Sequence, residues 1–441
     1  MLTARRRWTA ATAALVLAAG LAGCRGADPA TPSTEGAIKT DIGVTKEPCP
    51  KAIDTSKGCI YLGTISDLTV GPFAPLAVPI TKAQLAFWTR VNKAGGIGGY
   101  EIDVEKYVKD NKYNPQTHNE VYQEIKPNVL ALAQTLGSPT TAAILEDLKA
   151  SNIVAVPASW TSLWNFEDVI LESGANYCIE SMNAIDFAKG AKPTIKSVMA
   201  VHYAGDYGDD AAAGAKYAAE KNGLTFADTK TDPGQDKQAG AIQAILAAKP
   251  DLVILTTAPA EAAVIVGGLG QQAATSGYAP MVVGTSPTWN PALNASPAAP
   301  ALAALYFQSG PWPSWGSDTP GHKAMREALT PTPSPLSDGY TAGWVWSYPL
   351  KAVLEKAAAN KDLTRAGMLA AAKSLTSVDY EGMLPAGSGN YAGGADGSMV
   401  RVSVISKPDP NAPTGVAEVK PLGAGPTASG FKAGDKACYL G

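Results

Sequence analysis

Two stretches of hydroxyl-bearing residues follow predicted strands at positions where they could bind an anionic group. The segment LGSPTT, residues 136–141 with Ser138 near its centre, leaves one predicted strand and enters a predicted helix. The segment PASWT, which contains Ser159, Trp160 and Thr161, follows the next strand. Free N–H groups at the start of a helix attract negative charge, and a glycine lets the backbone approach a ligand. Helix capping by Ser or Thr explains the first segment equally well, so both interpretations stay open.

The second half of the chain offers a comparable set of residues. Tyr207 lies between a predicted strand at residues 197–203 and a predicted helix, and Thr257 and Ser286 follow two further predicted strands. Ligands of open α/β sheets bind at the carboxyl ends of the strands. Each of these residues alone fits an ordinary turn. Together, the two sets predict two facing rims with a small molecule between them.

No motif for catalysis or for a cofactor is evident in the sequence. It contains no G-x-S-x-G elbow, H-E-x-x-H motif or P-loop, and its three histidines are far apart. The GGIGG run at residues 95–99 ends a predicted helix and precedes a strand, which is the wrong context for dinucleotide binding. The acids Asp206, Asp209 and Asp210 lack the spacing of a calcium loop and fit a solvated helix start. We therefore expect neither an enzyme nor a bound metal or cofactor.

Short β-branched runs alternate with longer helical patterns along most of the chain. This alternation predicts an α/β fold with parallel sheets and helices on both faces, and its two series predict two Rossmann-like lobes. The expected strands are residues 60–65, 101–107, 129–135 and 152–156 in the first series and 197–203, 251–256 and 280–284 in the second. The expected helices are residues 80–91, 116–126, 140–150, 209–221, 238–248 and 260–272, followed by 340–358 and 363–374, with a last strand at 400–406.

Residues 1–23 are typical of a bacterial export signal, because a basic start precedes an apolar stretch and then small residues. The end of this segment, LAGC, resembles a lipobox, whose cysteine, here Cys24, is lipidated and becomes the first mature residue. An ordinary signal followed by a chance cysteine is the alternative. Residues 24–47 are rich in Pro, Thr, Gly and Ala and are expected to form a flexible tether. We therefore expect an extracytoplasmic protein, lipid-anchored to the cell membrane.

The charge balance excludes one class of partner. The 441 residues include 36 basic and 39 acidic ones, without a basic run beyond the export signal. A mildly acidic chain of this kind is a poor binder of phosphate backbones, so we expect no nucleic-acid partner.

Four cysteines beyond the lipobox are candidates for disulfides, since an even number is typical of exported chains. Three pairings are possible, and loop geometry favours Cys49 with Cys59 and Cys178 with Cys438. A zinc site is the competing interpretation, but the sequence lacks a C-x2-C pair, and the histidines are far apart.

Several segments resemble the branched-chain amino-acid-binding proteins of ABC importers. The segments are GTIS at residues 63–66, FAP at 73–75, VNKAGGIGG at 91–99, KDN at 109–111 and Asn114-Pro115. The resemblance extends over residues 59–405 and implies a type I periplasmic-binding-protein fold, in which a three-stranded hinge joins two lobes around the ligand. It implies a first lobe at residues 48–178 and 307–376 and a second lobe at residues 179–306 and 377–441.

The resemblance also implies roles for individual residues. Ser138 and Thr161 match positions that hold the amino-acid carboxylate, helped by backbone N–H groups near Ser159 and Trp160. Phe73 matches an aromatic residue beside the ligand side chain, and Tyr207 matches a tyrosine that closes over the ligand. We also include Thr257 and Ser286 in the predicted site because of their place at the rim.

One position departs from the family pattern. The family's acidic residue for the ligand ammonium aligns near Thr285 and Ser286, where the sequence has no carboxylate. A buried ammonium would lose a strong charge-assisted hydrogen bond there, so a related carboxylate or amide is as suitable a ligand as an amino acid. Glu261 could substitute, although a solvent-facing position is the simpler expectation.

These observations predict an extracytoplasmic solute-binding lipoprotein of an ABC importer. It would capture a small polar metabolite, such as an amino acid or a related carboxylate or amide, between its lobes and present it to the permease subunits. Two other classes stay open, namely a ligand-sensing receptor of the same fold without transport and an exported hydrolase. The absence of a nucleophile motif counts against the hydrolase.

Overall fold

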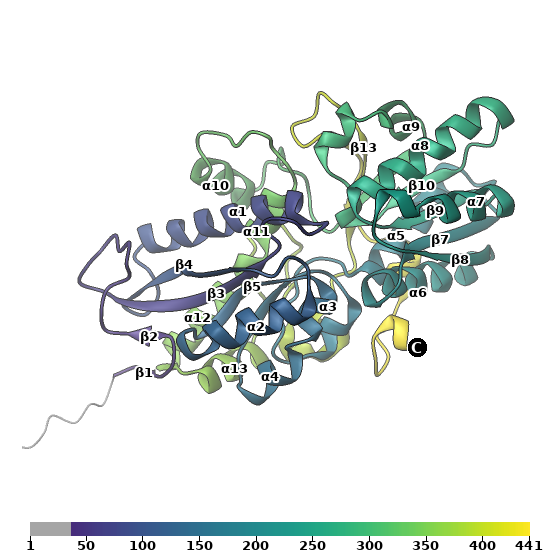
Figure 1. Ribbon diagram of the computed structural model, residues 1–441. Coiled ribbons are helices and arrows are strands. Elements are labelled where there is room, and N and C mark those ends of the chain that lie inside the picture. Colours follow the sequence, from purple (N-terminus) through teal and green to yellow (C-terminus); the bar gives the residue numbers. More distant parts are fainter. Residues whose placement is uncertain (1–36) are drawn as a thin grey trace, which may run out of the picture. The chain divides into compact units, whose positions relative to one another are not determined.

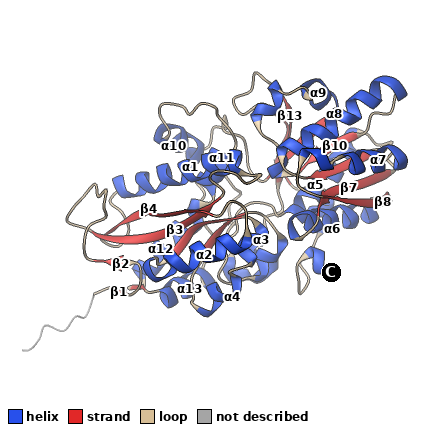
Figure 2. Ribbon diagram, viewed as in Figure 1, coloured by secondary structure: helices blue, strands red, loops and turns tan. Residues whose placement is uncertain are grey.

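Two β-sheets, each with helices on both faces, organise residues 37–441, which are the residues that the computed structural model describes. Figure 2 shows the strands of the two sheets as separate groups, with helices around each. The predicted export signal, Cys24 and most of the predicted tether lie outside the described residues. This mixed α/β architecture with largely parallel sheets confirms the predicted fold class.

The first sheet has five strands and is parallel except for the short β2, which pairs antiparallel to β3. Its strands are β2 (Val44–Thr45), β3 (Gly58–Ser66), β4 (Tyr100–Asp110), β5 (Ala131–Leu136) and β6 (Ala155–Ala158). The helices of this lobe are α1 (Ala74–Lys93), α2 (Pro115–Ile125), α3 (Ser138–Ala142), α4 (Leu145–Ala150), α10 (Pro320–Ala328), α11 (Gly339–Val345), α12 (Ser347–Ala359) and α13 (Arg365–Lys373). A separate parallel pair joins β1 (Lys39–Thr40) to β12 (Asp362–Leu363).

The second sheet has seven strands in the order β14-β13-β11-β10-β9-β7-β8. Its strands are β7 (Ser197–Tyr203), β8 (Thr225–Thr231), β9 (Leu252–Thr256), β10 (Met281–Gly284), β11 (Tyr306–Gly310), β13 (Ser403–Pro408) and β14 (Val416–Gly423). Only the pairings of β13 are antiparallel. The helices of this lobe are α5 (Tyr177–Ala191), α6 (Asp206–Lys221), α7 (Ala239–Ala248), α8 (Pro259–Ser276), α9 (Ala299–Leu305) and α15 (Pro426–Gly430), while α14 (Gly394–Ser398) lies in a connection between the sheets.

The sequence forms these elements for simple reasons. Every residue of β3 is buried, as expected for a central parallel strand with helices over both faces. In the first lobe α1 and α11 pack side by side (Figure 1), with Phe87 between Trp88 and Trp344 at centroid distances of 5.5 and 5.1 Å. Close aromatic packing of this kind fixes α11 on α1, which places the segment before α11 at the cavity described below.

The chain passes between the two lobes three times. The first passage lies between Leu171, which packs in the core of the first lobe, and Cys178, which packs in that of the second. The second passage lies between β11 and Trp312, and the third between Leu384 and Met399. Three crossings agree with the hinge that the family resemblance implies.

Three parts of the predicted domain division need correction. Residues 39–40 and 44–45, which we assigned to the tether, form β1 and β2 and pair with strands of the first lobe. Residues 307–310 belong to β11 in the second sheet rather than to the first lobe. Residues 378–384 contribute buried side chains to the first core rather than to the second lobe. The pattern of strands and helices cannot reveal on which side of a hinge a loop packs.

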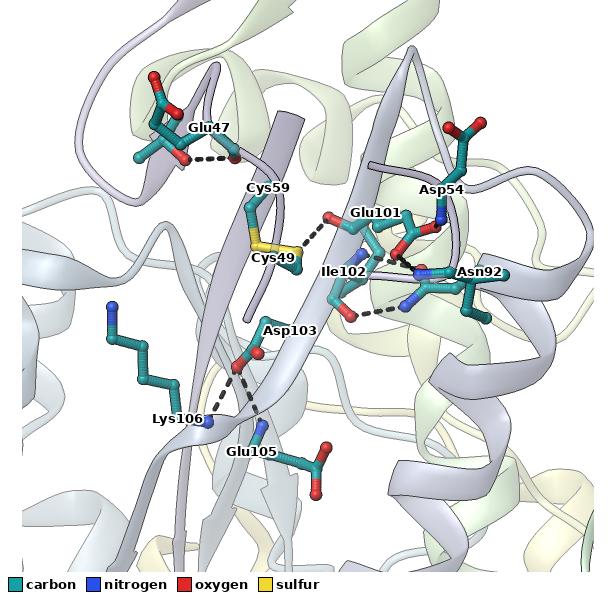
Figure 3. Close-up of a disulfide and its surroundings, with 12 residues drawn as sticks. Glu47, Cys49, Asp54, Cys59, Asn92, Glu101, Ile102, Asp103, Glu105 and Lys106 are labelled. Carbon is teal, nitrogen blue, oxygen red and sulfur yellow. Dashed lines mark hydrogen bonds between the residues drawn. A yellow bond between two sulfur atoms is a disulfide. The ribbon is translucent and has the colours of Figure 1, made fainter. Parts of the chain in front are cut away.

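Two disulfides confirm the favoured cysteine pairing: Cys49 with Cys59, and Cys178 with Cys438. Figure 3 shows the first of them beside β4, where Glu101 accepts hydrogen bonds from the backbone N–H groups of Ile53 and Asp54 at 2.9 and 2.7 Å. The disulfide and this carboxylate together hold the segment between β2 and β3 against the sheet.

Candidate functional site

A cavity lies between the two lobes and contains about 1060 Å³ of space, part of it open to solvent. The first lobe lines it with the start of α1, the ends of β5 and β6, and the segment around α11. The second lobe lines it with Tyr207 from α6, the loop after β10, and parts of β11, β13 and β14. The carboxyl ends of strands from both sheets therefore meet at one cavity, as expected for a ligand site in open α/β sheets.

Aromatic side chains form most of one wall of the cavity. The rings of Trp160 and Trp346 lie 4.5 Å apart, and Trp312 lies 5.4 and 5.5 Å from them. Phe73 lies 4.8 Å from Tyr113, at another part of the lining. Further apolar lining residues are Leu76, Ile80, Leu136, Ala158, Pro287, Trp289, Pro291, Pro311, Pro313, Ala342, Val404 and Val416. The surface that a ligand meets is predominantly apolar.

Ser138 is a buried polar residue of the lining whose hydroxyl has no partner. It is 1% exposed, and within residues 37–441 no hydrogen bond reaches its Oγ. Gly137, just before it, has φ 97°, and a Cβ there would lie 2.6 Å from Thr140 Oγ1 and 2.7 Å from the Tyr113 ring. The glycine is therefore needed where the chain turns from β5 into α3. A buried hydroxyl without a partner at a cavity wall can hydrogen-bond to a ligand.

The other predicted residues of the first lobe differ in their surroundings. Ser159 and Trp160 line the cavity, with Ser159 Oγ accepting a hydrogen bond from Trp164 Nε1 at 3.1 Å. The indole N–H of Trp160 donates to the Ser173 carbonyl at 3.1 Å, which fixes the orientation of the ring. Thr161 does not line the cavity, because its hydroxyl caps the short helix at residues 162–166.

Phe73 lines the cavity because Asp67 shapes the loop before α1. The carboxylate of Asp67 accepts hydrogen bonds from the backbone N–H groups of Gly71 and Phe73 at 2.9 and 3.0 Å. This loop closes directly before the helix begins at Ala74, so the Phe73 ring lies at the first turn of α1.

Tyr207 lines the cavity from the second lobe and packs against aromatic rings of the first. Its ring lies 4.7 Å from Tyr177 and 6.3 Å from Phe73. Its hydroxyl donates to the carbonyl of Thr257 at 3.1 Å, and burial raises the pKa of that hydroxyl. Thr257 itself does not line the cavity, since its side chain donates to the carbonyl of Ala258. Thr257 thus positions Tyr207 instead of facing the cavity.

A carboxylate does stand beside Ser286, although it comes from a distant part of the sequence. Glu180 in α5 accepts a hydrogen bond from Ser286 Oγ at 2.5 Å and one from its backbone N–H at 3.2 Å. Burial raises the pKa of Glu180 to about 7. Ser286 lines the cavity, whereas Glu180 lies behind it. Glu261, the other acid considered, is only 5% exposed and accepts from Gly234 N at 2.8 Å, so the expected solvent-facing position is wrong.

One ionisable carboxylate belongs to the lining itself. Asp338, directly before α11, is the only Asp or Glu among the described lining residues, and its Oδ1 has no hydrogen-bond partner there. Burial raises its pKa to about 6. The neighbouring Ser337 also lines the cavity, and its Oγ lacks a partner as well. The sequence analysis did not single out either residue, because a Ser-Asp pair before a helix is typical of a cap.

The histidines do not belong to the cavity lining. His118 lies between Asn111 and Thr135, with 3.0 Å to each, and burial lowers its pKa to about 3. His202 and His322 are also buried away from the cavity. Within residues 37–441, no three His, Cys, Asp or Glu side chains are arranged to hold a metal ion. Over the same residues, the helices are too short or too polar to cross a membrane.

Comparison with known proteins gives three findings. Residues 60–409 match the family model of periplasmic binding proteins. A search of curated protein sequences found no match. Among solved structures, the chain is similar to a fatty acid ABC transporter substrate-binding protein from Thermomonospora curvata, with 29% identity, a TM-score of 0.80, and coverage of 91% of this chain and 98% of the other.

Two further solved structures share the fold. A branched-chain amino acid ABC transporter protein from Thermus thermophilus with bound valine has 16% identity and a TM-score of 0.69, over 84% of this chain and 98% of the other. A possible leucine/isoleucine/valine-binding protein from Rhodopirellula baltica SH 1 has 17% identity and a TM-score of 0.68, over 82% of this chain and 96% of the other.

Proposed function

Because the chain belongs to the periplasmic binding protein family, we propose that it is the solute-binding protein of an ABC importer for a long apolar molecule with a carboxylate head, such as a fatty acid. Proteins of this family work outside the cytoplasm and bind a small ligand and permease components. The ligand class proposed here differs from the small polar metabolite that the sequence predicted.

The observation that carries the proposal is the apolar lining of the cavity. Four tryptophans, Trp160, Trp289, Trp312 and Trp346, line it together with Phe73 and a series of prolines. Removing apolar ligand surface from water contributes roughly 25 cal/mol per Å², so a hydrocarbon chain gains from such a wall. The similarity to the fatty acid ABC transporter substrate-binding protein of Thermomonospora curvata supports the same ligand class.

The environment of Ser286 argues against an α-amino acid. A buried ammonium group needs a carboxylate in contact with it. Glu180 is the acid nearest to the expected place, but both of its oxygens accept hydrogen bonds from Ser286, and it does not line the cavity. An ammonium group at this rim would therefore meet a hydroxyl and not a free carboxylate.

Ser138 is the residue that we assign to the ligand carboxylate. Its unpartnered hydroxyl lies at the wall of the cavity, and Ser159 is close to it at the end of the adjacent strand β6. A hydroxyl that donates to an ionised oxygen forms a stronger hydrogen bond than one between neutral groups. The ligand head would thus bind at the first lobe, and Tyr207 would close over the ligand from the second.

Two further parts of the proposal concern the cell. We propose that Cys24 carries the lipid anchor that holds the protein at the membrane, and that loss of the protein abolishes uptake. Uptake of labelled fatty acid by a deletion strain separates an importer component from a receptor of the same fold that only senses the ligand.

The direct test is a binding titration of the purified protein. The probes are octanoate, dodecanoate and hexadecanoate, with leucine and valine as the competing class and the methyl ester of hexadecanoate as a head-group control. Tryptophan fluorescence provides the signal, because four indoles line the cavity. We expect affinity to rise with chain length and to fall for the ester. Tight binding of valine or leucine together with no response to any fatty acid would overturn the proposal.

A further inference from the structure

A second group of unpartnered polar atoms lines the cavity away from Ser138. Ser337 is 3% exposed and its Oγ has no hydrogen-bond partner within residues 37–441. The Oδ1 atom of Asp338 is buried and lacks a partner in the same part of the chain. Buried polar atoms without partners are uncommon in folded proteins, and two adjacent ones at a cavity wall require an explanation.

These atoms and Ser138 come from different elements of the fold. Ser138 begins α3, which packs on α2, α6 and the strands β5 and β6. Ser337 and Asp338 precede α11, which packs on α1. A Cβ added at Gly339 would lie 2.8 Å from the carbonyl of Leu76 and 3.0 Å from Pro79, so this segment lies tightly against α1. One ligand head bound at Ser138 does not account for the second group.

The chemistry of the second group requires a hydrogen-bond donor. An ionised carboxylate can only accept hydrogen bonds, and a hydroxyl can accept or donate. Among the ion pairs of residues 37–441, none includes Asp338. The side chain of Thr414, from the loop before β14, hydrogen-bonds to the Asp338 carboxylate, so Oδ1 is the oxygen that lacks a partner. A ligand group that meets Asp338 must therefore supply the missing proton donor.

A plain hydrocarbon chain at this wall would be unfavourable. It would leave Ser337 Oγ and Asp338 Oδ1 without a hydrogen-bond partner in the bound state, and an unpaired buried polar atom costs free energy. The neighbouring lining residues Leu76, Ile80 and Ala342 are apolar. They therefore favour a ligand whose hydrocarbon chain carries a single polar substituent near Ser337 and Asp338.

We infer that the ligand is a bifunctional amphiphile, with a carboxylate at Ser138 and a hydrogen-bond donor along or at the end of its chain that meets Ser337 and Asp338. This inference rests on the proposed function and narrows the ligand class to substituted fatty acids. Hydroxyl and amine substituents share the required donor chemistry, and the experiment distinguishes them.

The test compares matched ligands on the full-length protein. Dissociation constants are measured for hexadecanoate, 16-hydroxyhexadecanoate, 16-aminohexadecanoate and 12-hydroxyoctadecanoate with octadecanoate as its parent. We expect at least one substituted acid to bind roughly tenfold more tightly than its unsubstituted parent, since hydrogen bonds to charged groups are worth about that much. A larger gain for the amine than for the hydroxyl would identify a charged donor.

Substitutions at the second group separate recognition from general damage. In Asp338→Leu the dissociation constants of the substituted acid and of its unsubstituted parent should become equal. The ratio of two dissociation constants within one protein cancels any general loss of folded protein. Ser337→Ala, a smaller change, should reduce the preference in the same direction and serves if Asp338→Leu does not fold.

The outcomes of the inference and of the proposed function differ. If hexadecanoate binds and every substituted acid binds no better than its parent, the inference is wrong and the proposed function stands. If the preference persists in both variants, the donor binds elsewhere and the inference is also wrong. If no fatty acid of any kind binds, the proposed function itself fails.

Discussion

The buried carboxylate of Glu180 accepts hydrogen bonds from both the hydroxyl and the backbone N–H of Ser286, at 2.5 and 3.2 Å. The two residues are 106 positions apart in the sequence, on α5 and in the loop after β10. While Glu180 is ionised, the hydroxyl group of Ser286 donates its proton to Glu180 and has no second proton to donate. Ser286 can then only accept a hydrogen bond from the cavity, which makes this rim unsuitable for a ligand carboxylate.

The first prediction concerns the dependence of stability on pH. Burial raises the pKa of Glu180 to about 7 in the folded protein, from an ordinary value of 4.5. The folded state therefore holds a proton that the unfolded state releases between these pH values, and stability falls as the pH rises through that window. Glu180→Gln should reduce this loss by roughly 1–3 kcal/mol between pH 5 and pH 8, measured by chemical denaturation.

Burial also raises the pKa of Asp210 to about 7, so part of the pH dependence of stability remains in the Glu180→Gln variant. The exposed Glu146→Gln serves as a control and should leave the pH dependence as it is in the wild type. Equal losses of stability in wild type and Glu180→Gln would show that Glu180 is ionised in the folded protein throughout.

The second prediction tests the assigned head-group residue. Ser138→Ala should weaken binding of a carboxylate ligand roughly tenfold, because a charge-assisted hydrogen bond is lost. Ser181→Ala is the matched control, since the Ser181 hydroxyl is also buried without a partner among residues 37–441 but does not line the cavity. Titration of both variants with the same fatty acid gives the answer. A similar loss in both, or in neither, would remove Ser138 from the binding site.

The third prediction concerns the closing tyrosine. Tyr207→Ala should weaken ligand binding more than tenfold, because it removes a ring that packs against Tyr177 and Phe73 at the cavity. Tyr207→Phe keeps the ring and removes only the hydrogen bond to the Thr257 carbonyl, which should lower stability by about 1 kcal/mol and leave affinity nearly unchanged. Binding titrations and thermal unfolding of the two variants separate these effects. If Tyr207→Ala bound the ligand with wild-type affinity, Tyr207 would not belong to the binding site.

The fourth prediction compares the two disulfides. Their cysteines are 10 and 260 residues apart. In the chain-entropy account a longer closed loop restricts the unfolded chain more, so removing the pair Cys178 and Cys438 should cost about 5 kcal/mol and removing Cys49 and Cys59 about 3 kcal/mol. Double alanine variants measured by denaturant unfolding test this order. A larger loss for the short loop would show that local contacts near β4 dominate.

Strands in the middle of the sheets could be predicted from the sequence with nearly correct bounds. The expected strand at residues 197–203 is β7, because its apolar run is continuous and buried on both faces. The edge strand β8 escaped prediction, since most of its residues are exposed and polar. Helix α5 was not predicted for the opposite reason. Ten of its residues are buried, so its sequence lacks the one-sided periodicity of a surface helix.

The candidate site could be predicted in part. Position at the end of a strand brought Ser138, Ser159 and Ser286 to the right edge, because the ends of parallel strands share one edge of a sheet. The same argument failed for Thr161 and Thr257, since it does not say where a side chain points. Asp338 and Glu180 could not be found in this way, because their positions depend on how α11 and α5 pack in three dimensions.

The disulfide between Cys178 and Cys438 has a consequence for a protein that works outside the cytoplasm. It joins a residue just beyond one hinge crossing to the C-terminal end. The covalent ring that it closes contains the second lobe and also residues 312–384 of the first lobe. A protease that cuts one peptide bond within this ring opens it without producing a separate fragment. In a molecule cut once, both lobes would therefore stay covalently connected, and the cut protein could remain folded.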